Sequence, residues 1–161
     1  MIGDNRTMKE TTLCYIENEA QYLMLHRTKK SNDPNKEKWI GVGGKIEPNE
    51  SIEECLRREV MEETGLVLTK YQYRGKIYFY SDIYEDELMH LYTATEFTGE
   101  VTECNEGELA WIEKSDILNL NLWEGDKVFL QKMLQEDIQP FVLKMYYEGE
   151  KLVNVIEEIE M

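Results

Sequence analysis

The sequence predicts one α+β domain in which a mixed sheet packs against two helices. The chain has 161 residues, which is the size of a single domain with its own core. Strand-like segments alternate with two helical segments, and no repeat, linker or low-complexity tract interrupts them. Hydrophobic residues make up 42% and charged residues 32%, which is a globular composition. We therefore treat residues 1–161 as one domain.

The N-terminal part begins with two short predicted strands and a loop. Residues 11–16 and 22–25 form a plausible hairpin that turns at residues 17–20. Residues 29–38 are polar, contain a proline and show no periodicity, so they predict an exposed loop that could close over a ligand.

A helix is predicted from Ile52 to about Thr64. Ser51 and Glu54 have the spacing of a capping box, in which each side chain accepts from the backbone N–H of the other residue. Gly65 can adopt the left-handed conformation that ends helices.

The C-terminal half of the sequence contains further predicted strands and a second predicted helix. Tyrosine and β-branched residues predict strands at residues 67–81, 88–97 and 109–112. A second helix is expected over residues 124–135, and a last strand over 141–147. The mixture of strands and two helices favours a layered α+β fold.

The first helix carries carboxylates where apolar residues are expected. On a helical wheel, Glu59 and Glu63 fall in line with Leu56 and Val60, and Glu62 flanks them. Two carboxylates in the buried stripe are either desolvated at considerable cost or open onto a cleft where a cation compensates them. Their spacing lets the three converge on about one helical turn. Oxygen ligands without histidine or thiolate favour Mg²⁺, or Mn²⁺, over zinc or copper.

The segment before this helix is rich in glycine. Gly41, Gly43 and Gly44 permit a close backbone approach, and free amides there could meet phosphate oxygens. The spacing is neither that of a P-loop nor that of a dinucleotide-binding turn. Lys45 is either a phosphate neighbour or a plain surface lysine. Arg58 could pair with Glu50 and fix the loop ahead of the helix.

Charge and composition exclude several classes of protein. The 33 acidic and 18 basic side chains give a net charge of −15, which repels a nucleic-acid polymer. No apolar run approaches the roughly 18 residues that span a bilayer. Residues 1–11 lack the hydrophobic stretch of a signal peptide, and three cysteines fit neither a disulfide framework nor a zinc site. We expect a cytoplasmic protein that binds neither membrane nor polymer; the sequence leaves the oligomeric state open.

One segment of the chain matches a known signature at every fixed position. The pattern is G-x5-E-x7-R-E-U-x-E-E-x-G-U, where U is a bulky apolar residue, and it resembles the signature of the Nudix hydrolase family. The resemblance implies an α/β/α sandwich with a mixed central sheet and a loop-helix-loop signature. It also implies a nucleoside diphosphate linked to another group as substrate, and a divalent metal held by Glu59, Glu62, Glu63 and often the Gly43 carbonyl. The matching residues are Gly44, Glu50, Arg58, Glu59, Val60, Glu62, Glu63, Gly65 and Leu66.

Outside the signature, the chain resembles the MutT-type branch of the family, especially its oxidised-purine triphosphatases. This resemblance implies an additional metal-site glutamate at Glu106 and nucleotide-pocket residues at Thr12, Arg27, Gly43, Gly44 and Lys45, with Trp123 and Asp126 near the base. Ile40 stands where that branch has an asparagine that touches the base. Trp39, Trp111 and Cys55 are expected to serve packing.

The predicted reaction is the Mg²⁺-dependent attack of water on a nucleoside triphosphate, giving a monophosphate and pyrophosphate. The predicted catalytic residues are Glu59, Glu62, Glu63 and Glu106, with Glu59 as first and Glu106 as second choice of general base. The leading substrate is 8-oxo-dGTP or a related oxidised purine nucleotide. The alternatives are hydrolysis of ADP-ribose or another nucleotide conjugate, and a nucleotide sensor that has lost hydrolysis.

Overall fold

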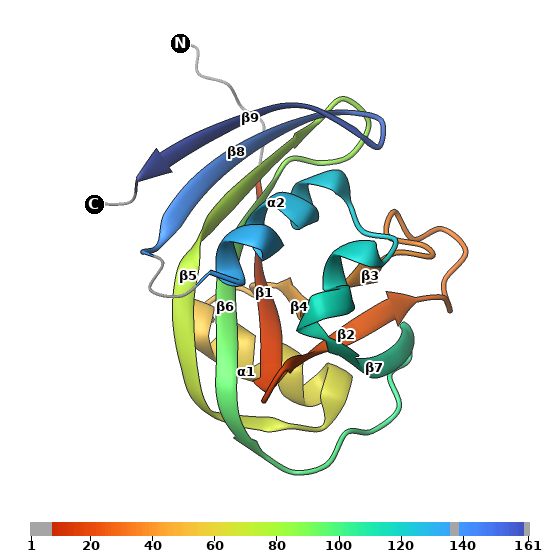
Figure 1. Ribbon diagram of the computed structural model, residues 1–161, viewed down its shortest axis with the longest axis vertical. Coiled ribbons are helices and arrows are strands. Elements are labelled where there is room, and N and C mark those ends of the chain that lie inside the picture. Colours follow the sequence, from red (N-terminus) through yellow and green to blue (C-terminus); the bar gives the residue numbers. More distant parts are fainter. Residues whose placement is uncertain (1–7, 136–138, 160–161) are drawn as a thin grey trace.

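In the computed structural model, which describes residues 8–135 and 139–159, one mixed sheet lies between helices (Figure 1). Helix α1 covers one face of this sheet, and α2 with a 3-10 helix, η1, covers the other. The sheet order is β3-β2-β1-β6-β5-β8-β9, with β4 paired to β1 and β7 paired to β2. In chain order the elements are β1 (Lys9–Asn18), β2 (Gln21–Arg27), β3 (Trp39–Ile40), β4 (Val42–Lys45), α1 (Ile52–Thr64), β5 (Val67–Ser81), β6 (Glu87–Thr98), β7 (Gly107–Glu113), η1 (Lys114–Asn119), α2 (Glu124–Met133), β8 (Phe141–Glu148) and β9 (Lys151–Ile159).

The predicted layered fold is confirmed, and most elements lie where the sequence placed them. The hairpin of β1 and β2 turns at residues 19–20, with Glu19 in a left-handed conformation. Helix α2 ends at Met133, two residues before its predicted end. The prediction missed β3, β4, η1 and β9. The prediction that residues 1–11 contain no signal peptide falls mostly on residues 1–7, which lie outside the described residues.

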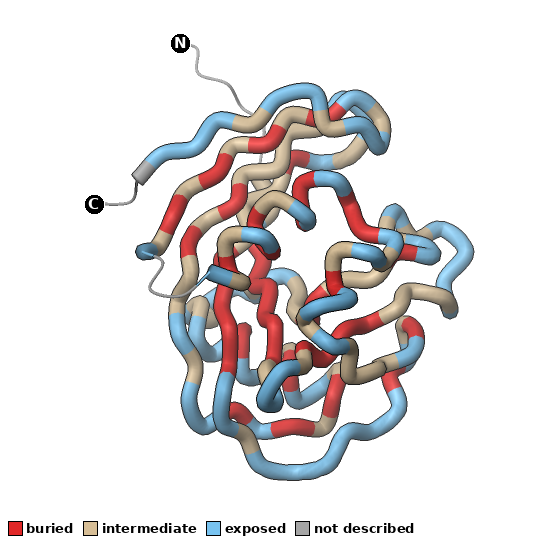
Figure 2. The backbone as a smooth tube through the Cα atoms, viewed as in Figure 1, coloured by how far each residue is buried: buried red, intermediate tan, exposed pale blue. Residues whose placement is uncertain are grey.

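Strand β1 is the strand around which the cleft is built. It pairs parallel with β6 and antiparallel with β2 and β4, so residues 11–16 are buried from both faces (Figure 2). In the β1–β4 register, Thr12 lies opposite Gly44 and Leu13 lies opposite Gly43. A Cβ on Gly43 would lie 1.9 Å from the Thr12 carbonyl oxygen, so this register requires glycine at position 43.

Each face of the sheet has its own hydrophobic core. Leu56 and Val60 of α1 pack with buried residues of β1, β2 and β6 on one side. Phe129 and Leu130 of α2 pack with residues of β1, β2, β5 and β8 on the other. Cys55, which was expected to pack, is fully buried. The two cores fix both helices relative to β1.

Both ends of α1 form as predicted. The Glu54 N–H donates to Ser51 Oγ over 3.1 Å, and the Ser51 N–H donates to Glu54 Oε1 over 2.8 Å. Gly65 ends the helix with φ of 82°. These caps fix the ends of α1, and the packing of Leu56 and Val60 on the sheet sets its rotation and therefore the direction in which its glutamates point.

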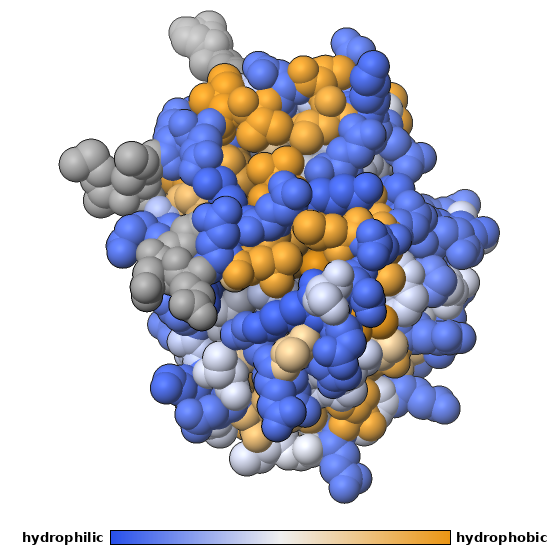
Figure 3. Space-filling model, in the orientation of Figure 1, coloured by the Kyte–Doolittle hydropathy of each residue, from blue (hydrophilic) through white to orange (hydrophobic). Residues whose placement is uncertain are grey.

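The molecular surface is largely hydrophilic in the view of Figure 3, with apolar residues gathered over the upper strands and near α2. Among the described residues no helix is long and apolar enough to span a bilayer. Cys14, Cys55 and Cys104 are all buried free thiols.

Candidate active site

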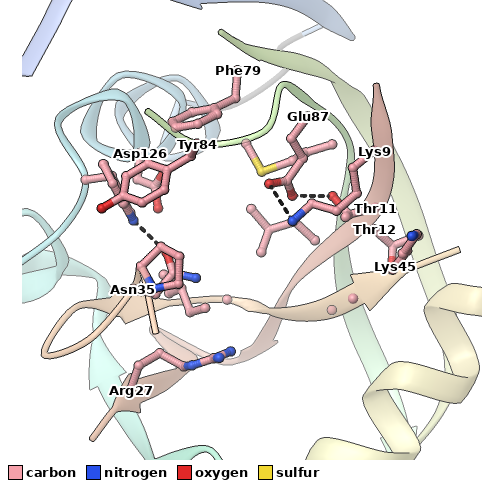
Figure 4. Close-up of a pocket in the computed structure, with 18 of the residues that line it drawn as sticks. Lys9, Thr11, Thr12, Arg27, Asn35, Lys45, Phe79, Tyr84, Glu87 and Asp126 are labelled. Atoms are coloured by element: carbon pink, nitrogen blue, oxygen red, sulfur yellow. Dashed lines mark hydrogen bonds and ion pairs between the residues drawn. The ribbon is translucent and has the colours of Figure 1, made fainter. Parts of the chain in front are cut away.

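A cleft of about 610 Å³ runs from α1 to the start of α2 (Figure 4). It has an acidic end, formed by glutamates of α1 and Glu106, and an aromatic end around Trp123. The structure brings together all of the predicted site residues except Glu62. Those that line the cleft are Thr12, Arg27, Ile40, Gly43, Gly44, Lys45, Glu59, Glu63, Glu106, Trp123 and Asp126.

Glu59 and Glu63 turn into the cleft, as the helical wheel predicts. The Glu59 side chain is 14% exposed, and its carboxylate lies against Gly44. Burial raises the pKa of Glu59. Burial, together with the charges of Glu106 and Glu59, raises the pKa of Glu63 to about 8. Three carboxylates therefore repel one another at one end of the cleft.

Glu62 lies apart from this group. Its side chain is 58% exposed, and its carboxylate accepts a hydrogen bond of 3.2 Å from Arg58. The predicted convergence of three helix glutamates is therefore incomplete, because Arg58 holds Glu62 on the outer flank of α1.

Arg58 organises the loop before α1. Its guanidinium makes a two-pronged contact with Glu50, at 2.6 and 2.9 Å, which confirms the predicted pair. It also donates to the Lys45 carbonyl and to Glu59. The Arg58 hydrogen bonds to Glu50, together with one from the Glu47 backbone N–H, lower the pKa of Glu50 to about 2. The result is a fixed connection between β4 and α1.

The acidic end fits a divalent cation by its chemistry. Its side-chain donors are carboxylate oxygens, which hard cations such as Mg²⁺ prefer. Their mutual repulsion and burial are costs that a cation would relieve. Within residues 8–135 and 139–159, no three His, Cys, Asp or Glu side chains are gathered closely enough to hold a metal as they stand. Glu62 could join Glu59 and Glu63 only by leaving Arg58.

Arg27 lies between two carboxylates. Its Nε donates to Asp33 over 2.6 Å, and its Nη1 donates to Glu106 over 3.0 Å. Lys30 lies 3.5 Å from Glu106 as well. Arg27 therefore connects the loop of residues 29–38 to the acidic end of the cleft. The sequence predicted Arg27 only as a residue of the nucleotide pocket and did not predict this connection.

The aromatic end is built around Trp123, which is 7% exposed. Phe79, Tyr84 and Tyr147 meet its indole edge-on, with ring centroids 5.4 to 6.2 Å apart. The Lys38 ammonium lies 4.9 Å from the indole centroid. This arrangement is a rigid, largely apolar wall.

Asp126 is a buried carboxyl group at this end. It lies in the first turn of α2 and is 7% exposed. Burial raises its pKa to about 7, helped by the charge of Glu87 and opposed by Lys38. Near neutral pH the group can therefore be present with or without its proton.

Asp126 gives a pH-dependent stability that can be measured. Because its pKa in the folded protein is raised from 3.8 to about 7, folding favours the protonated form, and stability is lost as pH rises through this window. Asp126→Asn has no ionisable group at this position, so the variant does not lose stability through this ionisation. We expect the stability of the variant relative to wild type to rise by up to roughly 4 kcal/mol between about pH 4 and about pH 8. Urea unfolding of both proteins measures this, and parallel pH profiles would contradict it.

Sequence reasoning missed several residues of the cleft. Lys9, Thr11 and Glu87 form a polar cluster in which Thr11 donates to Glu87 over 2.7 Å. Asp33 and Asn35 enter from the loop of residues 29–38. The only sequence signal for these two was the prediction that this loop could close over a ligand.

Two tryptophans pack away from the cleft, as expected. Trp39 stacks on His26 at 4.4 Å, and Trp111 stacks on Phe97 at 6.0 Å. Neither ring lines the cleft.

Comparison with known proteins identifies the class that this fold and cleft define. Residues 8–133 match the family model described as NUDIX domain, and the chain belongs to this family. It is a Nudix hydrolase. The identifications of both the family and the fold from sequence are confirmed.

Several known proteins are similar to the chain. The "Uncharacterized Nudix hydrolase YvcI" of Bacillus subtilis is 30% identical over 133 residues, covering 80% of each chain. The "Oxidized purine nucleoside triphosphate hydrolase" of Danio rerio is 32% identical over 127 residues, covering 76% of this chain and 80% of its own. The crystal structure of the mutator MutT protein from Bacillus halodurans superposes with a TM-score of 0.82 at 25% identity, covering 94% of this chain and 98% of that one.

Proposed function

We propose that the protein hydrolyses a nucleoside triphosphate, with Mg²⁺ as cofactor, to a nucleoside monophosphate and pyrophosphate. The observation that carries this proposal is the two-ended cleft, with carboxylates at one end and buried aromatic rings at the other. A nucleotide is divided in the same way when a divalent cation accompanies it, because the cation joins its polyphosphate to the carboxylates and its flat base fits the aromatic end. The names of the relatives from Danio rerio and other organisms support the same substrate class.

The residues of the acidic end would hold the cation and activate water. Glu59, Glu63 and Glu106 line the cleft and would hold the cation with the Gly43 carbonyl. Glu62 would join them by leaving Arg58. When bound there, Mg²⁺ supplies positive charge that neutralises phosphate oxygens and makes an attacking water more acidic. Mn²⁺ has the same ligand preference.

Glu59 remains our choice for the general base. Its carboxylate faces the cleft and lies against Gly44, next to the backbone segment that would meet the phosphates. In this role it takes the proton from the water that attacks phosphorus. Glu106, which is held by Arg27, is the second candidate.

The phosphates would lie along β1 and β4. Lys45 and Lys9 both line the cleft and supply positive charge. Thr12 lies beside Gly44 in the β1–β4 register, so its segment borders the glycines. These groups offset part of the repulsion that a protein with a net charge of −15 exerts on a polyanion.

The base would lie at the aromatic end. Trp123, Phe79 and Ile40 offer flat or apolar surface, and Asp126 supplies a carboxyl group that can accept or donate a hydrogen bond. The leading substrate is an oxidised purine deoxynucleotide such as 8-oxo-dGTP, which the protein would remove from the nucleotide pool. Buried free thiols fit a reducing cytoplasm as the setting.

A panel of nucleotides tests the choice of substrate. We expect the highest kcat/KM for 8-oxo-dGTP among 8-oxo-dGTP, the four ordinary deoxynucleoside triphosphates and ADP-ribose, measured by release of pyrophosphate and monophosphate. A preference for ADP-ribose would reassign the protein to nucleotide conjugates. Tight binding without turnover of any compound would indicate a nucleotide sensor.

A further inference from the structure

The loop of residues 29–38 is fastened at several points and forms one wall of the cleft. Asp33 accepts from Arg27, and the Glu37 carbonyl accepts from Asn121 Nδ2 over 2.9 Å. Within the loop, the Asn35 N–H donates to Asp33 Oδ1 over 2.9 Å, and the Lys38 N–H donates to the Asn35 carbonyl. The backbone at Asn35 is therefore held at a defined place beside the aromatic end.

The side chain of Asn35 has one orientation that its contacts allow. Trp123 Nε1 lies 2.7 Å from Asn35 Oδ1. An indole N–H can only donate, so the atom facing it must be the amide oxygen. The amide nitrogen of Asn35 then keeps its two N–H donors. Across the described part of the chain, no side chain or backbone group is found to accept from this nitrogen.

Asn35 brings a hydrogen-bond donor to a place where the neighbouring strand supplies none. Ile40 of β3 lines the same cleft with an aliphatic side chain. Figure 4 shows Asn35 and Asp126 at the same end of the cleft, with Asn35 joined to the indole by the dashed line. A fixed donor beside a carboxyl group matches a base edge that offers a carbonyl oxygen beside N–H groups.

We propose that Asn35 is a specificity-determining residue that selects bases with a carbonyl oxygen, as in guanine-type purines, over adenine-type purines with an amino group. A donor on the protein donates a hydrogen bond to a carbonyl oxygen of the base, whereas an amino group leaves two donors facing each other. The inference rests on the proposed binding of a nucleotide in this cleft, and it assigns the loop a part in choosing that nucleotide.

The direct test replaces Asn35 by Asp. Asn35→Asp keeps the size of the side chain and an oxygen that accepts from Trp123, but it turns the donor into an acceptor. Asn32→Asp is the matched control, because Asn32 lies exposed in the same loop, outside the cleft, and the change adds the same negative charge. Calorimetric titration with GMP and with AMP gives the Kd of each protein, and thermal melting verifies folding.

We expect Asn35→Asp to weaken GMP binding by on the order of tenfold or more relative to Asn32→Asp, while AMP binding stays the same or becomes tighter. In turnover of 8-oxo-dGTP, the loss should appear mainly in KM, because Asn35 is remote from the carboxylates. If Asn35→Asp does not fold, Asn35→Leu removes the donor and should give the same loss of GMP preference.

Equal effects on GMP and AMP, or no effect on either, would overturn the assignment of Asn35. A wild-type protein that prefers GMP in an Asn35-dependent way, yet hydrolyses no nucleotide, would support this inference while refuting the proposed hydrolysis. A wild-type protein that hydrolyses nucleoside triphosphates but shows no preference for GMP over AMP would overturn this inference and leave the proposed hydrolysis standing.

Discussion

Glu63→Gln is expected to lower kcat by on the order of 10³-fold while the protein stays folded. The carboxylate is buried in the acidic end of the cleft and is repelled by Glu106 and Glu59, so its charge has a cost in folding that a bound cation would relieve. Glutamine has the same shape but no charge and cannot serve as a carboxylate ligand. Steady-state hydrolysis of a nucleoside triphosphate in excess Mg²⁺ measures the loss, and Glu59→Gln should show one of similar size.

The stability of Glu63→Gln should move in the opposite direction from its activity. The pKa of Glu63 is raised from 4.5 to about 8 in the folded protein. Its ionisation therefore costs stability as pH rises through that window, and the variant avoids this cost. In EDTA, Glu63→Gln should melt at a higher temperature than wild type at about pH 8.

Glu53→Gln is the matched control for these changes. Glu53 lies exposed on the same helix, outside the cleft, where its carboxylate accepts from the Tyr71 hydroxyl. The substitution removes the same charge, and turnover should stay within about twofold of wild type. Near-normal turnover in both Glu59→Gln and Glu63→Gln would contradict the assigned site.

Gly44→Ala should lower kcat by on the order of 10²-fold without unfolding the protein. A Cβ at this position would lie 2.3 Å from Glu59 Oε2 and 2.5 Å from the other two atoms of that carboxylate group. The flexible end of Glu59 can move aside, so we expect a stability change below about 1 kcal/mol. A displacement of about 1 Å at a reacting group costs on the order of 10²-fold in rate. Measurement of kcat and of urea unfolding on the same sample separates the two effects.

A double variant identifies the cause of this loss. If Gly44→Ala acts by moving Glu59, then adding it to Glu59→Gln should cost little more than Glu59→Gln alone. Multiplicative losses would show that the methyl group acts independently of Glu59. Gly43→Ala provides the contrast, because its Cβ would strike the Thr12 backbone and should destabilise the fold by about 3 kcal/mol.

The acidic end of the cleft was predictable from sequence because it depends on local geometry. The caps at Ser51 and Gly65 fix the ends of α1, and the helical period then decides that Glu59 and Glu63 share a face with Leu56. The same wheel placed Glu62 at the flank of this face. In the structure Glu62 lies on that flank, where it accepts a hydrogen bond from Arg58.

The remaining features depend on contacts between distant parts of the chain. Asn35 meets Trp123 across a separation of 88 residues, and no local pattern in a polar loop signals such a bond. Strand β9 was missed although it contains Val153, Val155 and Ile156, which favour strands. Asn154, Glu157 and Glu158 interrupt this pattern, and the strand forms by pairing with β8. The short strands β3 and β4 lie in and beside a glycine-rich segment with weak strand propensity, and they form by pairing with β2 and β1, respectively.

The most direct test of the account is the dependence of triphosphate hydrolysis on a divalent cation. We expect the wild-type protein to convert 8-oxo-dGTP to the monophosphate and pyrophosphate in Mg²⁺, to stop in EDTA, and to recover when Mg²⁺ or Mn²⁺ is restored. Glu63→Gln should remain at its low rate throughout. Turnover that persists in EDTA at the wild-type rate, or release of orthophosphate in place of pyrophosphate, would contradict the proposed reaction.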